Sequence, residues 1–280
     1  MYRFIVGLFA LMSFVGLASE FVQHFPEVEN NVPYSKVAAL PFSQADQKLQ
    51  YGNEPLQYVL FWRAQQTKHA NKQPLVILIH GGCWLSAYDI KHTYALSTGL
   101  SQAGFNVWSL EYRRTGDQGG GWPGTFSDIQ AGIKAVEDFN NNEFDLTQAV
   151  LVGHSAGGHL ALLAGGKIDK LKGVIGLAAI TDIEAYSQGT NSCKKVTNDF
   201  MGGSVSDIPA TFALANPAKQ PLHKQTYLLQ GSQDTIVPQG DLANLAQRTI
   251  KVDGAGHFDW IHPGSTAFKT LIQQLKSIPQ

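Results

Sequence analysis

The sequence predicts an α/β fold in which helices cover both faces of a mostly parallel central sheet. Short, almost continuous apolar runs recur along the chain, for example residues 74–80 and 171–180, as strands buried on both faces require. Between such runs lie segments with helical spacing of apolar residues, for example Ile129, Ile133 and Val136. Because buried strands that alternate with helices pair in parallel, these two observations together predict the fold class.

Length, composition and charge narrow the possibilities further. The chain has 280 residues, long enough for one large domain, and its apolar share of 44% is ordinary for a globular core. The formal net charge of -1 offers no basic surface to nucleic acid or to an anionic membrane. We therefore expect a small-molecule partner and no nucleic acid.

Residues 1–18 have the pattern of a secretory signal peptide. Arg3 gives a basic start, residues 4–17 are uncharged and mostly apolar, and Gly16 and Ala18 place small residues where a signal peptidase requires them. The apolar run is short for a membrane span, and a retained N-terminal anchor is the alternative. We expect one domain over residues 19–280, secreted or periplasmic, without stable membrane insertion after cleavage.

The elements of this domain follow in chain order. Residues 19–54 are polar and irregular, and we expect them to wrap the outside. Strand composition predicts strands over residues 56–63, 74–80, 105–111, 150–152, 171–180, 225–230 and 248–252. Apolar spacing and caps predict helices over residues 94–103, from Ser127 to about 140, 156–165, 239–247 and 265–278. Residues 119–124 lack the lysine of a phosphate-binding loop and are expected to form a flexible loop that faces the pocket.

The stretch 149–163 (AVLVGHSAGGHLALL) carries the strongest motif. It places Gly-x-Ser-x-Gly, centred on Ser155, between an apolar strand and a helix, which is the setting of a nucleophile elbow. Such a turn holds the serine strained and exposed, and side chains at Gly153 and Gly157 would collide with neighbouring backbone. The pattern also arises by chance in an ordinary turn, so partners for Ser155 must be found.

An upstream loop supplies the first partner. Residues 80–84 (HGGCW) follow a buried strand, and two glycines there let backbone N–H groups face a cavity. This is the His-Gly-Gly type of oxyanion loop. We expect the oxyanion to be bound by N–H groups of Gly81, Gly82, Cys83 and Ala156.

A serine nucleophile also needs a base, and the base needs an acid that holds its tautomer. Asp234 lies four residues past the strand expected over 225–230. Asp182 follows the preceding strand and is the alternative acid. We prefer Asp234 because its strand is the later one and Asp182 opens a long irregular segment.

The base is expected downstream of the acid. His257 lies in a glycine-rich loop after the last strand, whereas its rival His262 is farther from that strand and precedes Pro263. His154 and His159 come before the acid and break the expected order, and His159 is more consistent with a packed helix residue. No metal-binding spacing is present, so neither a metal nor a cofactor is expected.

Two features outside the motifs concern access to the site. The segment 181–222 is long, and its apolar residues show little periodicity. We interpret it as a lid over the site, and a peripheral insertion is the alternative. Cys83 and Cys193 are the only cysteines, and in an oxidising compartment a disulfide between them would tether the lid to the oxyanion loop. We favour two separate buried thiols, because cysteine packs well as a small apolar residue.

The chain resembles the α/β-hydrolases, and within them the secreted esterase and kynurenine-formamidase-like branch. The matching residues are 80–84 (HGGCW), 111–114 (EYRR), 119–124 (GGGWPG), 153–159 (GHSAGGH), Asp234 with Val237 and Pro238, and 256–258 (GHF). The resemblance implies an eight-stranded sheet, whose first strands the sequence does not reveal. We also expect Trp84, His154 and Trp122, which belong to these motifs, to line the substrate pocket.

The motifs and the resemblance favour a serine hydrolase that cleaves a carboxylic ester of a small substrate through a Ser155–His257–Asp234 triad and an acyl-enzyme. Hydrolysis of an aryl-formamide such as N-formylkynurenine is the alternative, and the export signal argues mildly against it. A non-catalytic binding protein on the same scaffold is a third possibility. All three triad residues are present, which favours an enzyme.

Overall fold

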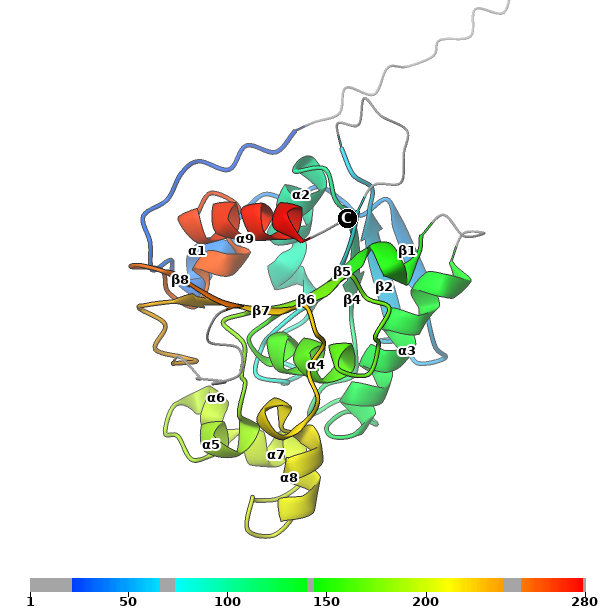
Figure 1. Ribbon diagram of the computed structural model, residues 1–280, viewed down its shortest axis with the longest axis vertical. Coiled ribbons are helices and arrows are strands. Elements are labelled where there is room, and N and C mark those ends of the chain that lie inside the picture. Colours follow the sequence, from blue (N-terminus) through cyan, green and yellow to red (C-terminus); the bar gives the residue numbers. More distant parts are fainter. Residues whose placement is uncertain (1–21, 66–73, 140–143, 239–247, 279–280) are drawn as a thin grey trace, which may run out of the picture.

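The computed structural model describes residues 22–65, 74–139, 144–238 and 248–278. An eight-stranded sheet runs through the middle of the domain (Figure 1). Its strands are β1 (Gln47–Gln50), β2 (Tyr58–Trp62), β3 (Leu75–Ile79), β4 (Asn106–Leu110), β5 (Ala149–His154), β6 (Gly173–Leu177), β7 (Thr226–Gly231) and β8 (Thr249–Val252). The predicted strands are therefore confirmed, with ends that differ by a few residues.

The strand order is β1-β2-β4-β3-β5-β6-β7-β8. Pairing is antiparallel from β1 to β2 and from β2 to β4, and parallel across the rest of the sheet. The chain order reverses at β3, which lies between β4 and β5. A ligand site is expected beyond the carboxyl ends of the strands at such a reversal.

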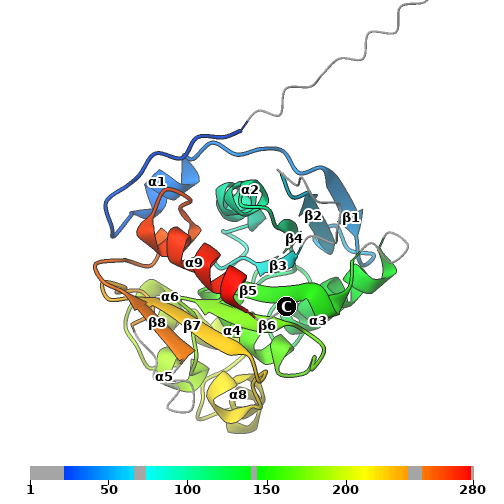
Figure 2. The same ribbon diagram turned by 45° about the horizontal axis from the view of Figure 1, so that its top comes forward.

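Helices cover both faces of the sheet, as predicted (Figures 1 and 2). The helices are α1 (Tyr34–Ala38), α2 (Tyr94–Gln102), α3 (Gly124–Asp138), α4 (Ala156–Gly165), α5 (Ile183–Ser187), α6 (Ser192–Lys195), α7 (Thr197–Met201), α8 (Pro209–Ala215) and α9 (Thr266–Ser277). Along β3, Ile77 and Ile79 pack into the apolar cluster of α3 and α4, while Val76 and Leu78 pack into that of α2 and α9. The strand is buried on both faces, which explains its continuous apolar run.

Two local predictions need correction. The segment 19–54 contains β1 and α1, which were missed because β1 (QKLQ) is a polar edge strand whose residues are exposed except for the half-buried Leu49. The third helix begins at Gly124 and has no side-chain cap. Ser127 lies in its first turn, where its hydroxyl donates to the Pro123 carbonyl.

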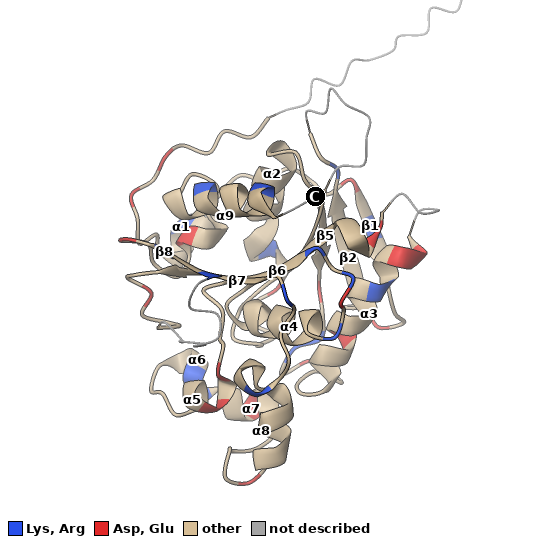
Figure 3. Ribbon diagram, viewed as in Figure 1, with Lys and Arg blue, Asp and Glu red and all other residues tan. Residues whose placement is uncertain are grey.

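Some predictions lie outside the described residues, namely the signal peptide over 1–18 and the helix over 239–247. In the described part of the chain, no helix is both long and apolar enough to cross a bilayer. Basic and acidic residues are scattered over the helices and loops (Figure 3). This distribution agrees with the near-zero net charge of the sequence.

Residues 181–222 form a helical insertion between β6 and β7. It contains α5 to α8 and extends from the sheet layer as a separate lobe (Figure 1). Asp182 caps α5 by accepting from the Ala185 N–H, and Phe200 of α7 stacks on Trp84 with ring centroids 4.7 Å apart. The insertion is thereby packed against the loop that follows β3.

Candidate active site

Ser155 occupies a sharp turn between β5 and α4. Its backbone has φ 57° and ψ -119°, a conformation that side chains rarely adopt and that is typical of strained functional positions. A Cβ at Gly153 would collide with the Gly157 carbonyl, and one at Gly157 with the carbonyls of Ile79 and His80. Both glycines of the motif are therefore required by close backbone packing, as the sequence predicted.

His257 and Asp234 lie on the loops after the last two strands and contact each other. Nδ1 of His257 is 2.8 Å from Oδ2 of Asp234, and both side chains are almost fully buried. The other Asp234 oxygen accepts the N–H groups of Ile236 and Val237, each at 2.9 Å. Since these contacts fix the carboxylate as an acceptor, Nδ1 of His257 donates, and Nε2 carries the lone pair that a general base needs.

The rival residues have other partners. Asp182 accepts from the Ala185 N–H and from the Asn216 amide, both within the helical insertion. Nδ1 of His262 accepts the Gly264 N–H at 3.1 Å. His159 is fully buried in α4 and its Nε2 donates to the Ala215 carbonyl at 2.7 Å, so it is the packed helix residue that the sequence predicted.

The loop 80–84 holds its peptide groups by a buried network. Nδ1 of His80 lies 2.8 Å from the Gly81 carbonyl oxygen, and because a carbonyl only accepts, Nδ1 donates to it. A trans peptide points its C=O and the following N–H in opposite directions. Anchoring the Gly81 carbonyl beside the His80 ring therefore turns the Gly82 N–H away from that ring.

Glu111 holds the far side of the His80 ring. Its Oε1 lies 2.9 Å from His80 Nε2, and its Oε2 accepts the Ile90 N–H at 3.0 Å. Burial by itself raises the pKa of Glu111, but His80, Arg114 and the Ile90 N–H outweigh burial and hold that pKa below its usual value. Both ring nitrogens of His80 therefore have a buried hydrogen-bond partner, the Gly81 carbonyl on one side and the Glu111 carboxylate on the other.

The second oxyanion donor expected from the sequence is Ala156. It is the first residue of α4, and the first N–H groups of a helix have no partner within the helix. The helix dipole adds partial positive charge at that end, which favours a developing anion. The Ala156 N–H follows Ser155 directly, as an elbow donor should.

Cys83 and Cys193 form a disulfide, with Cα atoms 5.2 Å apart. The expectation that favoured two separate thiols is therefore wrong. The sequence could not reveal this contact because 110 residues separate the two cysteines. The bond connects the loop 80–84 to α6 of the helical insertion, and both cysteines line the cavity described next.

A cavity of about 200 Å³ brings Ser155 and His257 together. Its lining comprises Tyr34, Gly82, Cys83, Tyr88, His92, His154, Ser155, Asn191, Ser192, Cys193, Ile236, His257 and Phe258. Of the three side chains expected in the pocket, only His154 is part of this lining. Sequence reasoning missed Tyr34, Tyr88 and His92, for which no motif gave a signal, and Phe258, which belongs to the motif 256–258 but was not expected in the pocket.

Trp84 and Trp122 lie behind the cavity. Trp84 is fully buried between Phe200 and His159. The Trp122 ring stacks on Phe126, and the backbone N–H of Trp122 donates to the Phe200 carbonyl at 2.8 Å. The expectation that loop 119–124 faces the pocket is therefore wrong. The loop packs against α7 through Trp122 and contributes no residue to the cavity lining.

Burial keeps His92 and His154, two histidines of the cavity lining, uncharged at neutral pH. It lowers the pKa of His92 to about 3, and it holds the pKa of the fully buried His154 well below its usual value, with His257 beside it adding to the effect. Nε2 of His154 donates to the His257 carbonyl at 3.0 Å, which ties the elbow to the loop of the expected base. Within the described ranges no group of three or more metal-binding side chains occurs.

Comparisons with known proteins agree with this architecture. The fold is that of the α/β-hydrolases: esterase B from Lactobacillus rhamnosus has a TM-score of 0.68 at 17% identity, covering 88% of this chain and 89% of that one. A truncated carbohydrate esterase from gut microbiota has a TM-score of 0.68 at 18% identity, covering 84% of this chain and 96% of that one.

The chain belongs to the BD-FAE family of α/β-hydrolase esterases, whose model matches residues 64–248. Among curated proteins it is similar to esterase LipC of Mycobacterium tuberculosis, with 24% identity over 249 residues. That match covers 77% of this chain and 60% of LipC, so the chain spans less than two thirds of this relative.

Proposed function

We propose that the protein hydrolyses carboxylic esters of small substrates, with Ser155 as nucleophile, His257 as general base and Asp234 as the acid that orients it. The observation that carries the proposal is the 2.8 Å contact from His257 Nδ1 to Asp234, in a cavity that Ser155 and His257 line together. Family membership supports ester hydrolysis, since the relatives named above are esterases.

In the proposed reaction, His257 Nε2 takes the Ser155 proton while the hydroxyl oxygen attacks the ester carbonyl carbon. N–H groups of Ala156 and of Gly82 stabilise the oxyanion, and each such donor typically lowers the barrier by about 3 kcal/mol. His257 then protonates the departing alcohol, which leaves the acyl group on Ser155. Water, deprotonated by His257, hydrolyses the acyl-enzyme and restores the serine.

The test is turnover of p-nitrophenyl esters by the full chain and by Ser155→Ala. We expect hydrolysis by the wild type and a loss of several orders of magnitude in the variant, with an unchanged melting temperature. Ser127→Ala, an exposed serine of α3, is the matched control and should retain full rate. Full activity of Ser155→Ala would overturn the assignment.

The substrate panel separates the chemical classes. It should include an acetylated sugar, because one similar structure is that of a carbohydrate esterase, and N-formylkynurenine, for the aryl-formamide alternative. We expect ester cleavage to exceed formamide cleavage. Faster turnover of N-formylkynurenine would shift the proposal to formamide hydrolysis.

We also propose that the protein is exported and that the helical insertion 181–222 acts as a lid. The pattern of residues 1–18 and the disulfide support export, since disulfides persist in oxidising compartments. N-terminal sequencing of exported protein should begin near residue 19, and a chain that retains Met1 would contradict this.

The lid proposal is supported by Asn191, Ser192 and Cys193, which line the cavity from the insertion. Limited proteolysis before and after reduction tests whether the disulfide holds the insertion. We expect faster cleavage within residues 181–222 once the bond to Cys83 is reduced. An unchanged cleavage rate would show that packing alone holds this segment.

A further inference from the structure

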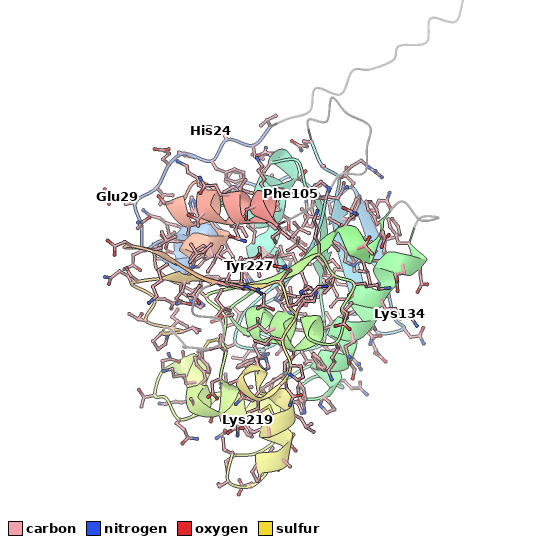
Figure 4. The ribbon with its side chains drawn as sticks, viewed as in Figure 1. His24, Glu29, Phe105, Lys134, Lys219 and Tyr227 are labelled. Atoms are coloured by element: carbon pink, nitrogen blue, oxygen red, sulfur yellow. A yellow bond between two sulfur atoms is a disulfide. The ribbon has the colours of Figure 1, made fainter. Side chains whose placement is uncertain are left out.

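The N-terminal arm, residues 22–46, runs across the outside of the domain, contributes Tyr34 to the cavity lining and then leads into β1. Figure 4 labels His24 and Glu29 on this arm, and Figure 1 shows α1 near the carboxyl-terminal helix α9. The arm lies outside residues 64–248, the part of the chain that the family model matches. Whatever it contributes to the cavity is therefore a property of this chain beyond the matched region.

Asp259 clamps the arm to the loop of the proposed base. This fully buried carboxylate accepts the N–H groups of Asn31 at 2.9 Å and Val32 at 2.8 Å. The same carboxylate accepts the N–H of Gly256 at 3.1 Å, directly before His257 in the chain. Val32 is itself buried in the apolar cluster of α2 and α9, so the arm is docked by both polar and apolar contacts.

The clamp brings Tyr34 into the cavity wall. Its ring centroid lies 5.4 Å from that of Phe258 and 5.9 Å from that of Tyr88. All three side chains line the same cavity as Ser155. Burial raises the pKa of Tyr34, with Tyr88 and Asp89 adding to the effect, so the side chain is a neutral aromatic wall at physiological pH.

We propose that Tyr34 is a specificity-determining residue that limits the size of the ester group admitted beside Ser155. The cavity holds about 200 Å³, and the ring of Tyr34 forms part of its boundary. Removing that ring opens the wall towards the arm, whereas Ser155, His257 and Asp234 keep their contacts. This inference rests on the proposed ester hydrolysis and adds to it the residue that selects small substrates.

The test compares kcat/KM for two ester series in the full chain. One series lengthens the acyl group from acetate to octanoate on a fixed p-nitrophenol, and the other enlarges the alcohol on a fixed acetyl group. In Tyr34→Ala we expect the large-to-small ratio to rise by about tenfold or more in one series, because steric selection in a pocket is worth such factors. The acetate rate should change by no more than about threefold.

Matched variants separate the wall from other roles. Tyr34→Phe keeps the ring and should keep the wild-type ratios to within about twofold, because the ring contacts form the wall. Ser35→Ala changes an exposed neighbour in the same helix and should leave all rates unchanged. Tyr34→Leu retains apolar packing and serves if the alanine variant melts early, with an intermediate rise in the ratio expected.

The outcomes distinguish this inference from the proposed function. Unchanged ratios in folded Tyr34→Ala and Tyr34→Leu, with an active wild type, would overturn the role of Tyr34 and leave ester hydrolysis standing. An equal fall for all esters would also overturn it, since that would assign Tyr34 a purely structural role. A wild type that cleaves no ester in either series would overturn both proposals.

Discussion

Two buried histidine–carboxylate pairs lie at the carboxyl ends of the sheet strands, and they share the same short contact. His80 Nε2 is 2.9 Å from Glu111, after β3 and β4, and His257 Nδ1 is 2.8 Å from Asp234, after β7 and β8. The pairs differ in what the second ring nitrogen faces. In His80 it donates to the Gly81 carbonyl, whereas His257 lines the cavity with Ser155.

This difference shows that a buried histidine–carboxylate pair does not by itself indicate a catalytic base. Both ring nitrogens of His80 are occupied, Nδ1 by the Gly81 carbonyl and Nε2 by Glu111. This pair therefore holds the backbone of the loop 80–84 and has no nitrogen free for proton transfer. The pair of His257 leaves one nitrogen available for proton transfer. We infer that the first pair positions the oxyanion donors and that the second performs the chemistry.

The largest expected effect is the loss of activity when the proposed base, His257, is replaced. His257→Ala should lower kcat/KM by about 10⁴-fold or more, because the proposed reaction uses His257 to take the Ser155 proton. His262→Ala, which removes a histidine of the same segment with a different partner, should cost little. Initial rates on p-nitrophenyl acetate measure both, and the opposite ranking would transfer the role to His262.

The next effect concerns the acid. Asp234→Asn should lower kcat by about 10³ to 10⁴-fold, because an amide in this position no longer holds His257 with its Nδ1 donating. Asp182→Asn should be mild, since Asp182 caps α5 and bonds Asn216 without contacting His257. A larger loss in Asp182→Asn than in Asp234→Asn would contradict the assignment.

The role of His80 is tested by two amides of different length. In His80→Asn the amide nitrogen can replace Nδ1 and keep the Gly81 anchor, whereas in His80→Gln it replaces Nε2 and keeps only Glu111. We expect His80→Gln to lose about 10²-fold in kcat, the typical effect of a lost oxyanion donor, and His80→Asn to lose less.

The melting temperatures of these two variants should follow the opposite order to their kcat values. His80→Asn removes a partner from the buried Glu111 and should melt earlier than His80→Gln. Melting curves and kcat together therefore distinguish positioning from a general structural role. If the variant that melts earlier also has the lower kcat, the proposed role of the Gly81 anchor fails.

The smallest expected effect is a pH dependence of stability. Burial lowers the pKa of His159 to about 4, from a usual value of 6.5. The unfolded chain therefore binds the proton first, and stability falls as pH drops from about 6.5 to about 4, by up to about 1.4 kcal/mol per pH unit. His159→Gln keeps a donor for the Ala215 carbonyl and does not titrate. Its urea midpoint should fall less between pH 7 and pH 5 than that of the wild type.

The sequence predicted those parts of the molecule that local physics determines. β3 and β5 are nearly continuous apolar runs because both faces are buried, and Gly153 and Gly157 are needed for a turn that no side chain permits. The contact between Asp234 and His257 was predictable because both residues follow strands of one parallel sheet.

Other parts depend on how distant segments close over the sheet. β1 was missed because its sequence is polar and its strand forms by pairing with β2, a segment about ten residues further along the chain. Tyr34 reaches the cavity through an arm held by Asp259, 228 residues from its partner Asn31. Trp84 belongs to the motif 80–84 and was therefore expected in the pocket, but Phe200 of the insertion stacks on the Trp84 ring. None of these contacts leaves a periodic or spaced pattern in the sequence.

Covalent labelling tests most directly the central claim that Ser155 is the nucleophile activated by His257. The wild type is treated with a fluorophosphonate and the adduct is mapped by peptide mass spectrometry. We predict one adduct, on Ser155, which is absent in Ser155→Ala and forms far more slowly in His257→Ala. An adduct on a different residue, or equal labelling rates in the wild type and His257→Ala, would contradict the account.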